Sequence, residues 1–229
     1  MRNILLCSAA LAAFALPATA NAKPMTPNDL VSFKRLAGST VSPDGTMVAY
    51  QQRETDLDGN KGRTDLWLLQ INGKDATPQK IASKPDKNES DAAFAPDGSG
   101  IYYLSNETGS SQVWRYDLKT QASAQVSNLK TDISGFKLSP DGKKIAIWGD
   151  ISKDCPQFDC DKDGNTALPG PGSGREYDQL FVRHWDQWET PGNYSRLFTF
   201  DIGADGKLSG SGRPAWAKVQ LSIAADSST

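Results

Sequence analysis

Two cysteines that lie close together in the chain indicate one kind of chemistry. Cys155 and Cys160 frame the sequence Cys-Pro-Gln-Phe-Asp-Cys. In an exported chain, a pair this close most simply forms a disulfide. Free thiols and a metal site are the alternatives, and the lack of further cysteines or histidines nearby argues against zinc. We therefore expect a local disulfide between Cys155 and Cys160.

The acidic run that follows has the pattern that opens a calcium-binding loop. Asp159, Asp161 and Asp163 alternate with other residues and are followed by Gly164. Oxygen ligands at alternate positions, with a glycine for the sharp turn, suit calcium. The twelfth position of such a loop should be glutamate, but here it is Gly170, so the bidentate ligand is missing. The sequence predicts weak calcium binding and no other cofactor; the alternative is an acidic, solvated loop.

The sequence offers few candidates for catalysis. His184 is the only histidine, and an isolated histidine is more often structural than catalytic. The Gly-x-Ser-x-Gly sequence that presents a nucleophilic serine is absent. Serines such as Ser42 and Ser139 fall in predicted turns. A Ser-His-acid triad cannot be assembled from these residues, so we assign no catalytic residue.

A repeated strand–turn–strand unit must position these residues. In each copy a small residue precedes Pro-Asp-Gly, and a strand with alternating apolar positions follows. Proline fixes φ for the turn, aspartate can bond its own backbone, and glycine accepts the left-handed conformation that closes it. Alternation places the apolar side chains on one face of the strand. The copies are residues 42–51, 95–104 and 139–148.

A second segment follows each first one, with an aromatic residue at the same place in each. These segments are residues 64–71, 111–118 and 195–202, and a weaker third strand comes next. Units of about 40–50 residues with four strands are typical of β-propeller blades. A generic antiparallel sheet that reuses a common turn is the alternative, but two aligned segments per unit favour blades. The aligned aromatic residues are Trp67, Trp114 and Phe198.

The predicted fold class is all-β, a partial β-propeller of about three four-stranded antiparallel blades with a short N-terminal helix. In the N-terminal segment 23–40, Thr26 is the expected helix cap and Gly38 the expected end. Leu30, Phe33 and Leu36 form an apolar stripe at helical spacing. The partial propeller covers 41–213, with blades at about 41–83, 92–128 and 133–210, an insertion at 151–190, and an irregular tail at 214–229.

Residues 1–22 are predicted to be a secretory signal peptide. Arg2 precedes an apolar run over 4–16 that is too short to span a bilayer, and small residues suited to cleavage follow. We therefore expect a periplasmic or secreted protein without membrane contact after signal cleavage. The net charge is −2, from 25 basic and 27 acidic residues without a basic run, which argues against nucleic acid as a partner.

Together these features resemble exported enzymes of the prolyl oligopeptidase family, and most closely its dipeptidyl and acylaminoacyl peptidases. The stretch 175–200, which includes REYDQLFVRHWDQW, and the cysteine pair ahead of it carry the resemblance. The resemblance covers roughly residues 26–205. It implies a propeller of seven or eight blades that precedes an α/β-hydrolase domain. In that family the propeller filters peptides by size and helps to hold the substrate.

The chain departs from this family because it holds about three blades and no hydrolase domain. We therefore expect the propeller portion of a secreted serine peptidase that is inactive on its own. Its partners would be peptide substrates, on which the missing hydrolase domain would act. A truncated gene with a frameshifted tail would account for residues 214–229, which stand where another blade is expected. The alternative is a periplasmic TolB-like binding or assembly module. Three blades leave open edges, so self-association is also expected.

Overall fold

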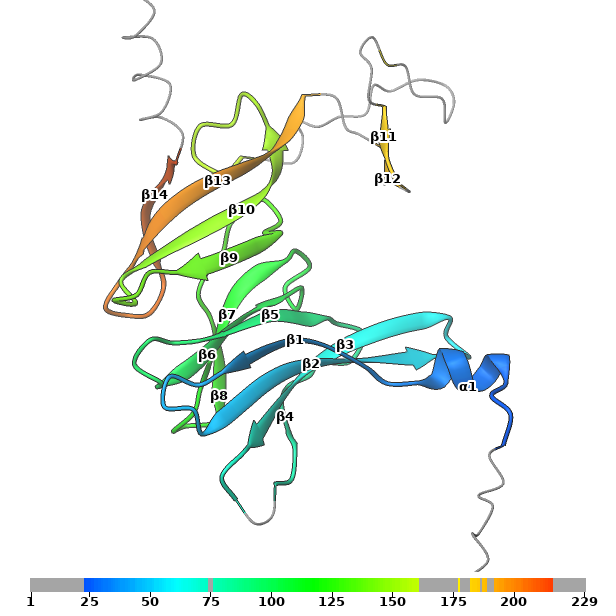
Figure 1. Cartoon of the computed structure of the whole chain (residues 1–229). Helices are drawn as coiled ribbons and strands as arrows, with labels where there is room; N and C mark the ends of the chain where they lie inside the picture. The colour runs from blue at the N-terminus through cyan, green and yellow to red at the C-terminus, as the bar shows by residue number, and fades with distance from the viewer. Residues whose placement is uncertain are drawn as a thin grey trace, which may run out of the picture.

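The computed structural model describes residues 23–73, 76–160, 177, 182–185, 187–188 and 192–215. The predicted signal peptide and most of the predicted tail lie outside these residues. Three four-stranded sheets follow one another along the chain. Figure 1 shows the second of them between the other two. In this part of the chain no helix has the length and hydropathy needed to cross a bilayer.

The helix α1 (Pro27–Ser32) begins as the sequence predicts. Thr26 is its N-cap, and Thr26 Oγ1 accepts a hydrogen bond from the Asp29 N–H at 3.2 Å. The Asp29 carboxylate accepts the Thr26 N–H at 2.9 Å, which completes a capping box. These two bonds satisfy backbone donors that would otherwise lack partners at the helix start.

The predicted end of the helix at Gly38 is wrong, because the helix stops at Ser32. Leu36 belongs instead to the first strand. The predicted apolar stripe is left largely uncovered by the described residues, since Leu30, Phe33 and Leu36 are 55%, 53% and 67% exposed. Short helices are only marginally stable in water unless one face packs against the rest of the protein. Among the described residues, no such packing stabilises further helical turns beyond Ser32.

The three sheets each contain four antiparallel strands in chain order, apart from the long connection in the third. This confirms the predicted all-β fold class with three blades and one short helix. We call the sheets blades 1, 2 and 3. Blade 1 is β1 (Arg35–Val41), β2 (Met47–Asp56), β3 (Lys61–Gln70) and β4 (Gln79–Ala82); blade 2 is β5 (Glu89–Phe94), β6 (Gly100–Ser105), β7 (Gln112–Asp117) and β8 (Ala122–Gln125); blade 3 is β9 (Gly135–Leu138), β10 (Lys144–Ser152), β13 (Asn193–Ile202) and β14 (Leu208–Pro214).

The three blades share one register between their second and third strands. The aromatic residues that align in sequence lie at equivalent places in this register, which confirms the predicted alignment. In blades 2 and 3 the equivalent pairs are buried against the preceding blade, whereas in blade 1 they are half-buried. The pairs are Tyr50–Trp67, Tyr103–Trp114 and Ile147–Phe198.

The Pro-Asp-Gly segments form the predicted turns. Gly45, Gly98 and Gly142 have φ of +71°, +71° and +69°, a conformation that glycine adopts at little cost. In each turn the glycine N–H donates to the carbonyl three residues earlier at 2.9 Å. The turn aspartate accepts the N–H two residues later at 3.0–3.1 Å, as the sequence predicts.

A fourth turn of this kind lies between β13 and β14 and was missed from the sequence because it lacks the proline. Gly206 has φ +75° and its N–H donates to the Gly203 carbonyl at 2.9 Å. Asp205 accepts the N–H of Lys207 at 3.2 Å. Aspartate and glycine therefore suffice to build the turn when a hairpin surrounds them.

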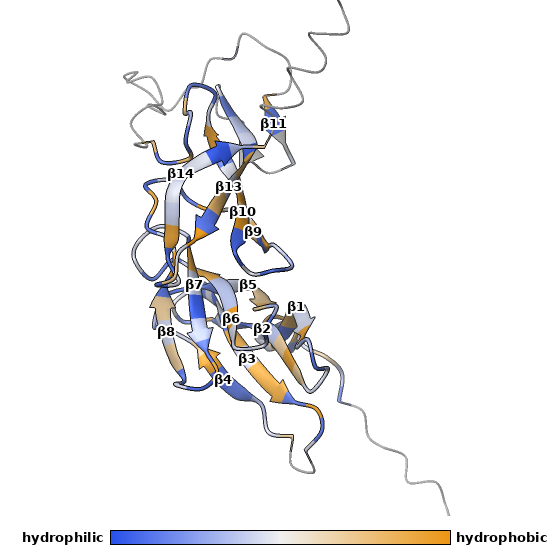
Figure 2. Ribbon diagram, turned by 90° about the vertical axis from the view of Figure 1, so that its left-hand side faces the viewer, coloured by the Kyte–Doolittle hydropathy of each residue, from blue (hydrophilic) through white to orange (hydrophobic). Residues whose placement is uncertain are grey.

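Two apolar clusters join the blades in sequence. One combines Leu66 of blade 1 with Ile101 and Trp114 of blade 2. The other combines Val113 of blade 2 with Ile147 and further residues of blade 3. Figure 2 shows hydrophobic residues mainly in the strands, interleaved with hydrophilic ones. Blade-to-blade packing therefore supplies the core of this molecule.

A small additional hairpin lies in the connection between β10 and β13. It consists of β11 (Arg183–His184) and β12 (Gln187–Trp188), paired antiparallel. Figure 1 draws this hairpin to the side of blade 3. It belongs to the stretch 175–200 that carries the family resemblance.

Candidate functional site

The two cysteines lie just after β10 and are joined. Cys155 and Cys160 form a disulfide with Cα atoms 5.9 Å apart. Phe158, between them, is fully buried, and its ring centroid lies 5.3 Å from that of Phe198 on β13. The short loop closed by the disulfide therefore extends the core between blades 2 and 3.

Arg196 of β13 fixes the chain that enters this loop. Its Nη1 atom donates to the backbone carbonyls of Ser152, Lys153 and Cys155 at 3.0, 3.0 and 2.7 Å. A guanidinium group suits this role because its donors have a fixed planar geometry. The disulfide loop is thus held by a side chain as well as by its own covalent link.

The predicted calcium ligands are described only in part. Asp159 Oδ1 accepts the backbone N–H of Lys130 at 2.9 Å. Asp161 and Asp163 lie outside the described residues, so calcium binding stays a prediction. In the described part of the chain, no three His, Cys, Asp or Glu side chains are grouped to hold a metal ion. The backbone of His184 lies in β11, and its side chain is outside what the structure describes.

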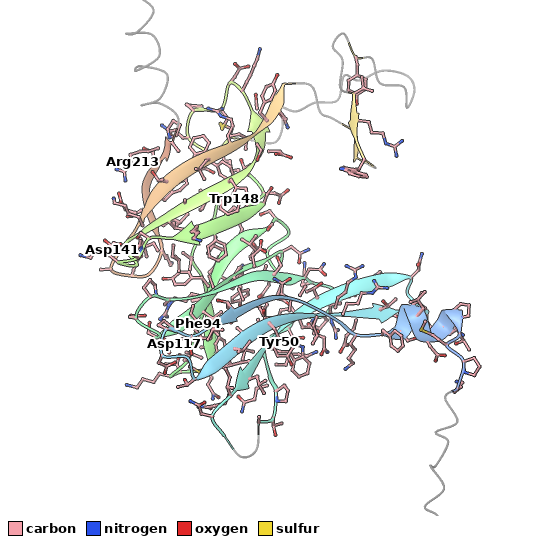
Figure 3. All side chains as sticks on the ribbon, in the orientation of Figure 1. Tyr50, Phe94, Asp117, Asp141, Trp148 and Arg213 are labelled. Atoms are coloured by element: carbon pink, nitrogen blue, oxygen red, sulfur yellow. A yellow bond between two sulfur atoms is a disulfide. The ribbon has the colours of Figure 1, made fainter. Side chains whose placement is uncertain are left out.

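The strongest candidate for a binding site lies where the first strands of the blades meet. β1, β5 and β9 are neighbours in the order of the blades. A cavity of about 480 Å³ opens between them, a volume within the range of ligand pockets. Figure 3 labels two of its wall residues, Phe94 and Trp148. We call it the inner-strand hollow; its lining is Gly38, Ser39, Gln51, Asp91, Ala92, Ala93, Phe94, Pro96, Phe136, Lys137, Leu138, Ser139, Pro140 and Trp148.

Two β-bulges shape the walls of the inner-strand hollow. In β1 the register shifts between Ala37 and Thr40, and in β5 between Ser90 and Ala93. The bulges occupy the same place in the two blades. Each contains a left-handed residue that lines the hollow; these are Gly38 with φ +55° and Asp91 with φ +52°. Bulges of this kind often redirect side chains beside functional sites.

Blade 3 builds its wall differently, because β9 pairs with β10 without a shift. Trp148 of β10 lies opposite Gly135 of β9, and a Cβ atom on Gly135 would collide with the indole ring. The glycine therefore lets the indole lie against the backbone of β9. This packing places an aromatic surface in the wall of the hollow.

The charged residues of the hollow are Asp91 on β5 and Lys137 on β9. Neither side chain has a hydrogen bond or ion pair with another described residue. Partial desolvation raises the pKa of the Asp91 carboxyl, although the residue as a whole remains more than a third exposed. Asp91 was not predicted from the sequence; the available signal was an aspartate within a strand, just before Ala92, Ala93 and Phe94, where aspartate is depleted.

A second polar site lies at the boundary between blades 1 and 2. Glu89 of β5 and Asp65 of β3 are 1% and 0% exposed. Asp65 Oδ2 accepts from Lys80 Nζ at 2.9 Å and from Arg63 Nε at 3.2 Å. Ser105 Oγ is the donor to Glu89. One oxygen of each carboxyl has no hydrogen-bond partner in the described residues.

Asp65 has polar counterparts at the same register position in the other blades. These counterparts are Gln112 and Arg196. Gln112 Nε2 donates to the carbonyls of Leu129 and Thr131 at 2.9 and 3.2 Å. In blades 2 and 3 the side chain at this position donates hydrogen bonds to backbone carbonyls at or beyond the end of the sheet. In blade 1 the Asp65 carboxylate at this position instead binds the cations of Lys80 and Arg63.

Several known proteins to which this chain is similar are named as peptidases. A dipeptidyl-peptidase 5 of Porphyromonas gingivalis is 29% identical over 164 residues, a match that covers 72% of this chain and 23% of the relative. A dipeptidyl-peptidase 4 of Giardia intestinalis is 24% identical over 204 residues, covering 78% of this chain and 26% of the relative. The chain thus spans about a quarter of the length of these relatives.

Among solved structures, a Pyrococcus horikoshii acylaminoacyl peptidase is similar in fold, with a TM-score of 0.57 and 16% identity. That match covers 82% of this chain and 26% of the other. No protein-family model matches the chain. These findings confirm the predicted resemblance to dipeptidyl and acylaminoacyl peptidases.

Proposed function

We propose that this chain is the substrate-gating propeller part of an exported serine peptidase that acts on peptides. The observation that carries the proposal is the inner-strand hollow, where the first strands of all three blades contribute to one cavity. The peptidase relatives support a peptide as the occupant. The proposed partners are peptide substrates; nucleic acid and membranes are not among them in this proposal, in keeping with the net charge of −2 and the lack of a basic run.

Export is part of this proposal. The predicted signal peptide motivates it, and the Cys155–Cys160 disulfide supports it because such bonds persist in oxidising compartments. Recovery of the protein from the periplasm or medium, with a new N-terminus near Lys23, is the expected result of expression in a secreting host. Retention of residues 1–22 in a cytoplasmic product would contradict it.

The chain is also proposed to be inactive alone. Acyl transfer needs a nucleophile, a base within reach and oxyanion donors. The sequence contains no Gly-x-Ser-x-Gly motif and no set of residues that would form a Ser-His-acid triad. The test uses dipeptidyl and acylaminoacyl chromogenic substrates and a fluorophosphonate probe. We expect neither turnover nor labelling. The control is His184→Ala: labelling of the wild type that this variant loses would overturn the proposal.

Peptide gating is tested separately from catalysis. Titration calorimetry with unstructured peptides of increasing length should show binding to the purified chain, and a small folded domain should not bind. A preference for folded partners over peptides would instead favour a TolB-like assembly module.

A further inference from the structure

The inner-strand hollow has a carboxylate whose presence its own fold does not explain. The carboxylate of Asp91 makes no hydrogen bond or ion pair with another described residue, yet the residue occupies a left-handed position in a β-bulge. Glycine fills the equivalent bulge of blade 1, at Gly38. Aspartate tolerates this conformation better than most residues but gains nothing there from the surrounding chain. Residues held in sparsely populated backbone regions are often found at functional sites.

The surroundings of Asp91 suit a cation that arrives from outside. Phe94, Phe136 and Trp148 supply apolar and aromatic surface in the same hollow. An aromatic face attracts ammonium and guanidinium groups, and a partly desolvated carboxylate binds them more strongly than one in bulk water.

Lys137 completes the charge pattern of the hollow. It lies on β9 while Asp91 lies on β5, and the two side chains form no ion pair with each other. A ligand that meets both needs a cationic group together with a carbonyl or carboxylate oxygen. A peptide carries both kinds of group.

We propose that the inner-strand hollow binds the ammonium or guanidinium group of a peptide through the carboxylate of Asp91. This inference rests on the proposed function, since it names the peptide chemistry that the gate selects. Lys137 then contacts an oxygen of the same peptide, and Trp148 covers the cation.

The chain provides a closely matched control residue. Asp86 is also a left-handed aspartate, with φ +59°, but it lies outside the hollow and faces Lys61 at 3.9 Å. Aspartate-to-asparagine changes preserve shape and left-handed tolerance at both sites while removing the charge. Asp91→Gly is a second variant, which relaxes the backbone and also removes the charge.

The test is titration calorimetry of the full chain with three blocked peptides. Acetyl-Ala-Lys-Ala-amide carries a side-chain cation, Ala-Ala-Ala-amide carries an α-ammonium, and acetyl-Ala-Ala-Ala-amide carries neither. We expect at least one cationic peptide to bind about tenfold more tightly than the neutral one. A gain of about this size is expected from a single hydrogen bond to a charged group. Whichever cationic peptide is favoured identifies the source of the cation.

In Asp91→Asn and Asp91→Gly this preference should disappear, whereas Asp86→Asn should keep it. Thermal melting of each variant establishes that it is folded. Binding that is equal for charged and neutral peptides, or a preference that survives both Asp91 changes, overturns this inference and leaves peptide gating intact. Absence of binding to all three peptides overturns the gating function as well.

Discussion

Ser105 donates a hydrogen bond from Oγ to Oε1 of Glu89 across 3.2 Å, at the boundary between blades 1 and 2. The other oxygen of this carboxyl has no partner in the described residues. Burial raises the pKa of Glu89 to about 7, and the negative charges of Asp65 and Glu107 add to the effect while the Arg63 cation opposes it. Glu89 therefore keeps its proton in the folded chain at pH values where the unfolded chain has lost it.

The free energy of unfolding should consequently fall as pH rises from 5 to 8. In this window the folded state binds more protons than the unfolded state, which makes the slope negative. A shift from 4.5 to about 7 corresponds to roughly 3 kcal/mol. Urea unfolding at both pH values should show the loss in the wild type and much less of it in Glu89→Gln.

The control for Glu89 is Glu107→Gln, which removes a nearby charge and should keep most of the pH dependence. The turn carboxyls of Asp44, Asp97 and Asp141 have pKa values lowered chiefly by serine hydroxyl donors. These carboxyls stabilise the folded state at neutral pH, and that stabilisation is lost only as pH falls through their lowered pKa values. Their titration therefore does not affect the free energy of unfolding between pH 5 and 8. Equal slopes for wild type and Glu89→Gln would contradict the assignment.

The disulfide loop should depend more on its buried ring than on its covalent link. Phe158→Ala removes a fully buried side chain and should cost about 3–5 kcal/mol. Replacing Cys155 and Cys160 together by serine opens a short loop and should cost about 2 kcal/mol. Urea unfolding measures both, and mass spectrometry should find no free thiol at Cys155 or Cys160 in the wild type. A larger loss from the cysteine change would reverse the ranking.

The left-handed turn glycines should be sensitive to substitution for backbone reasons alone. Gly45 has φ +71°, and a Cβ atom there would meet no other atom within 4 Å. Gly45→Ala should therefore cost about 1 kcal/mol from conformational strain, without any clash. Gly45→Asn should cost less, since asparagine tolerates this conformation. Equal costs for the two, measured by thermal melting, would point to a different cause.

Calcium binding is expected to be weak, because the predicted loop lacks the bidentate glutamate. Titration calorimetry should show binding only at about millimolar calcium. The heat should vanish in Asp161→Asn, while Asp86→Asn serves as an acidic control elsewhere. An unchanged titration in Asp161→Asn, or no heat at all, would dismiss the calcium prediction.

Self-association is expected through the face of blade 1 that is directed away from blade 2. Tyr50 and Trp67 are half-buried there, whereas their counterparts in blades 2 and 3 pack against a preceding blade. Leu69 belongs to the same face, since it lies two residues beyond Trp67 on β3. Light scattering should show oligomers that Leu69→Lys reduces. Leu57→Lys, at an exposed turn, should leave them unchanged, and a monodisperse wild-type monomer would refute the idea.

Local stereochemistry made the turns and strands predictable. Proline, aspartate and glycine each restrict a particular backbone position, so the turns could be placed without knowing their neighbours. The alternation of apolar residues then set the faces of the strands. The same reasoning aligned Trp67 with Trp114, and the register of the blades agrees.

The features that were missed depend on packing between distant segments. The sequence around Asp91 does not encode a bulge that forms only when β5 pairs with β6. Glu89 has the composition of a surface residue, and only the approach of blade 1 buries it. The helix was predicted too long for the same reason, because its apolar stripe implied a partner that does not cover Leu30 or Phe33.

The pairing of β10 with β13 has a practical consequence. It continues without interruption to Ser152 and Asn193, and the Lys153 N–H then donates to the Gly192 carbonyl at 2.9 Å. The two ends of the intervening segment are therefore neighbours, and the entropy of closing such a loop grows only logarithmically with its length. A foreign sequence inserted between Cys160 and Gly192 should leave the register of β10 and β13 unchanged. Blade 3 is therefore a suitable scaffold for displaying grafted epitopes.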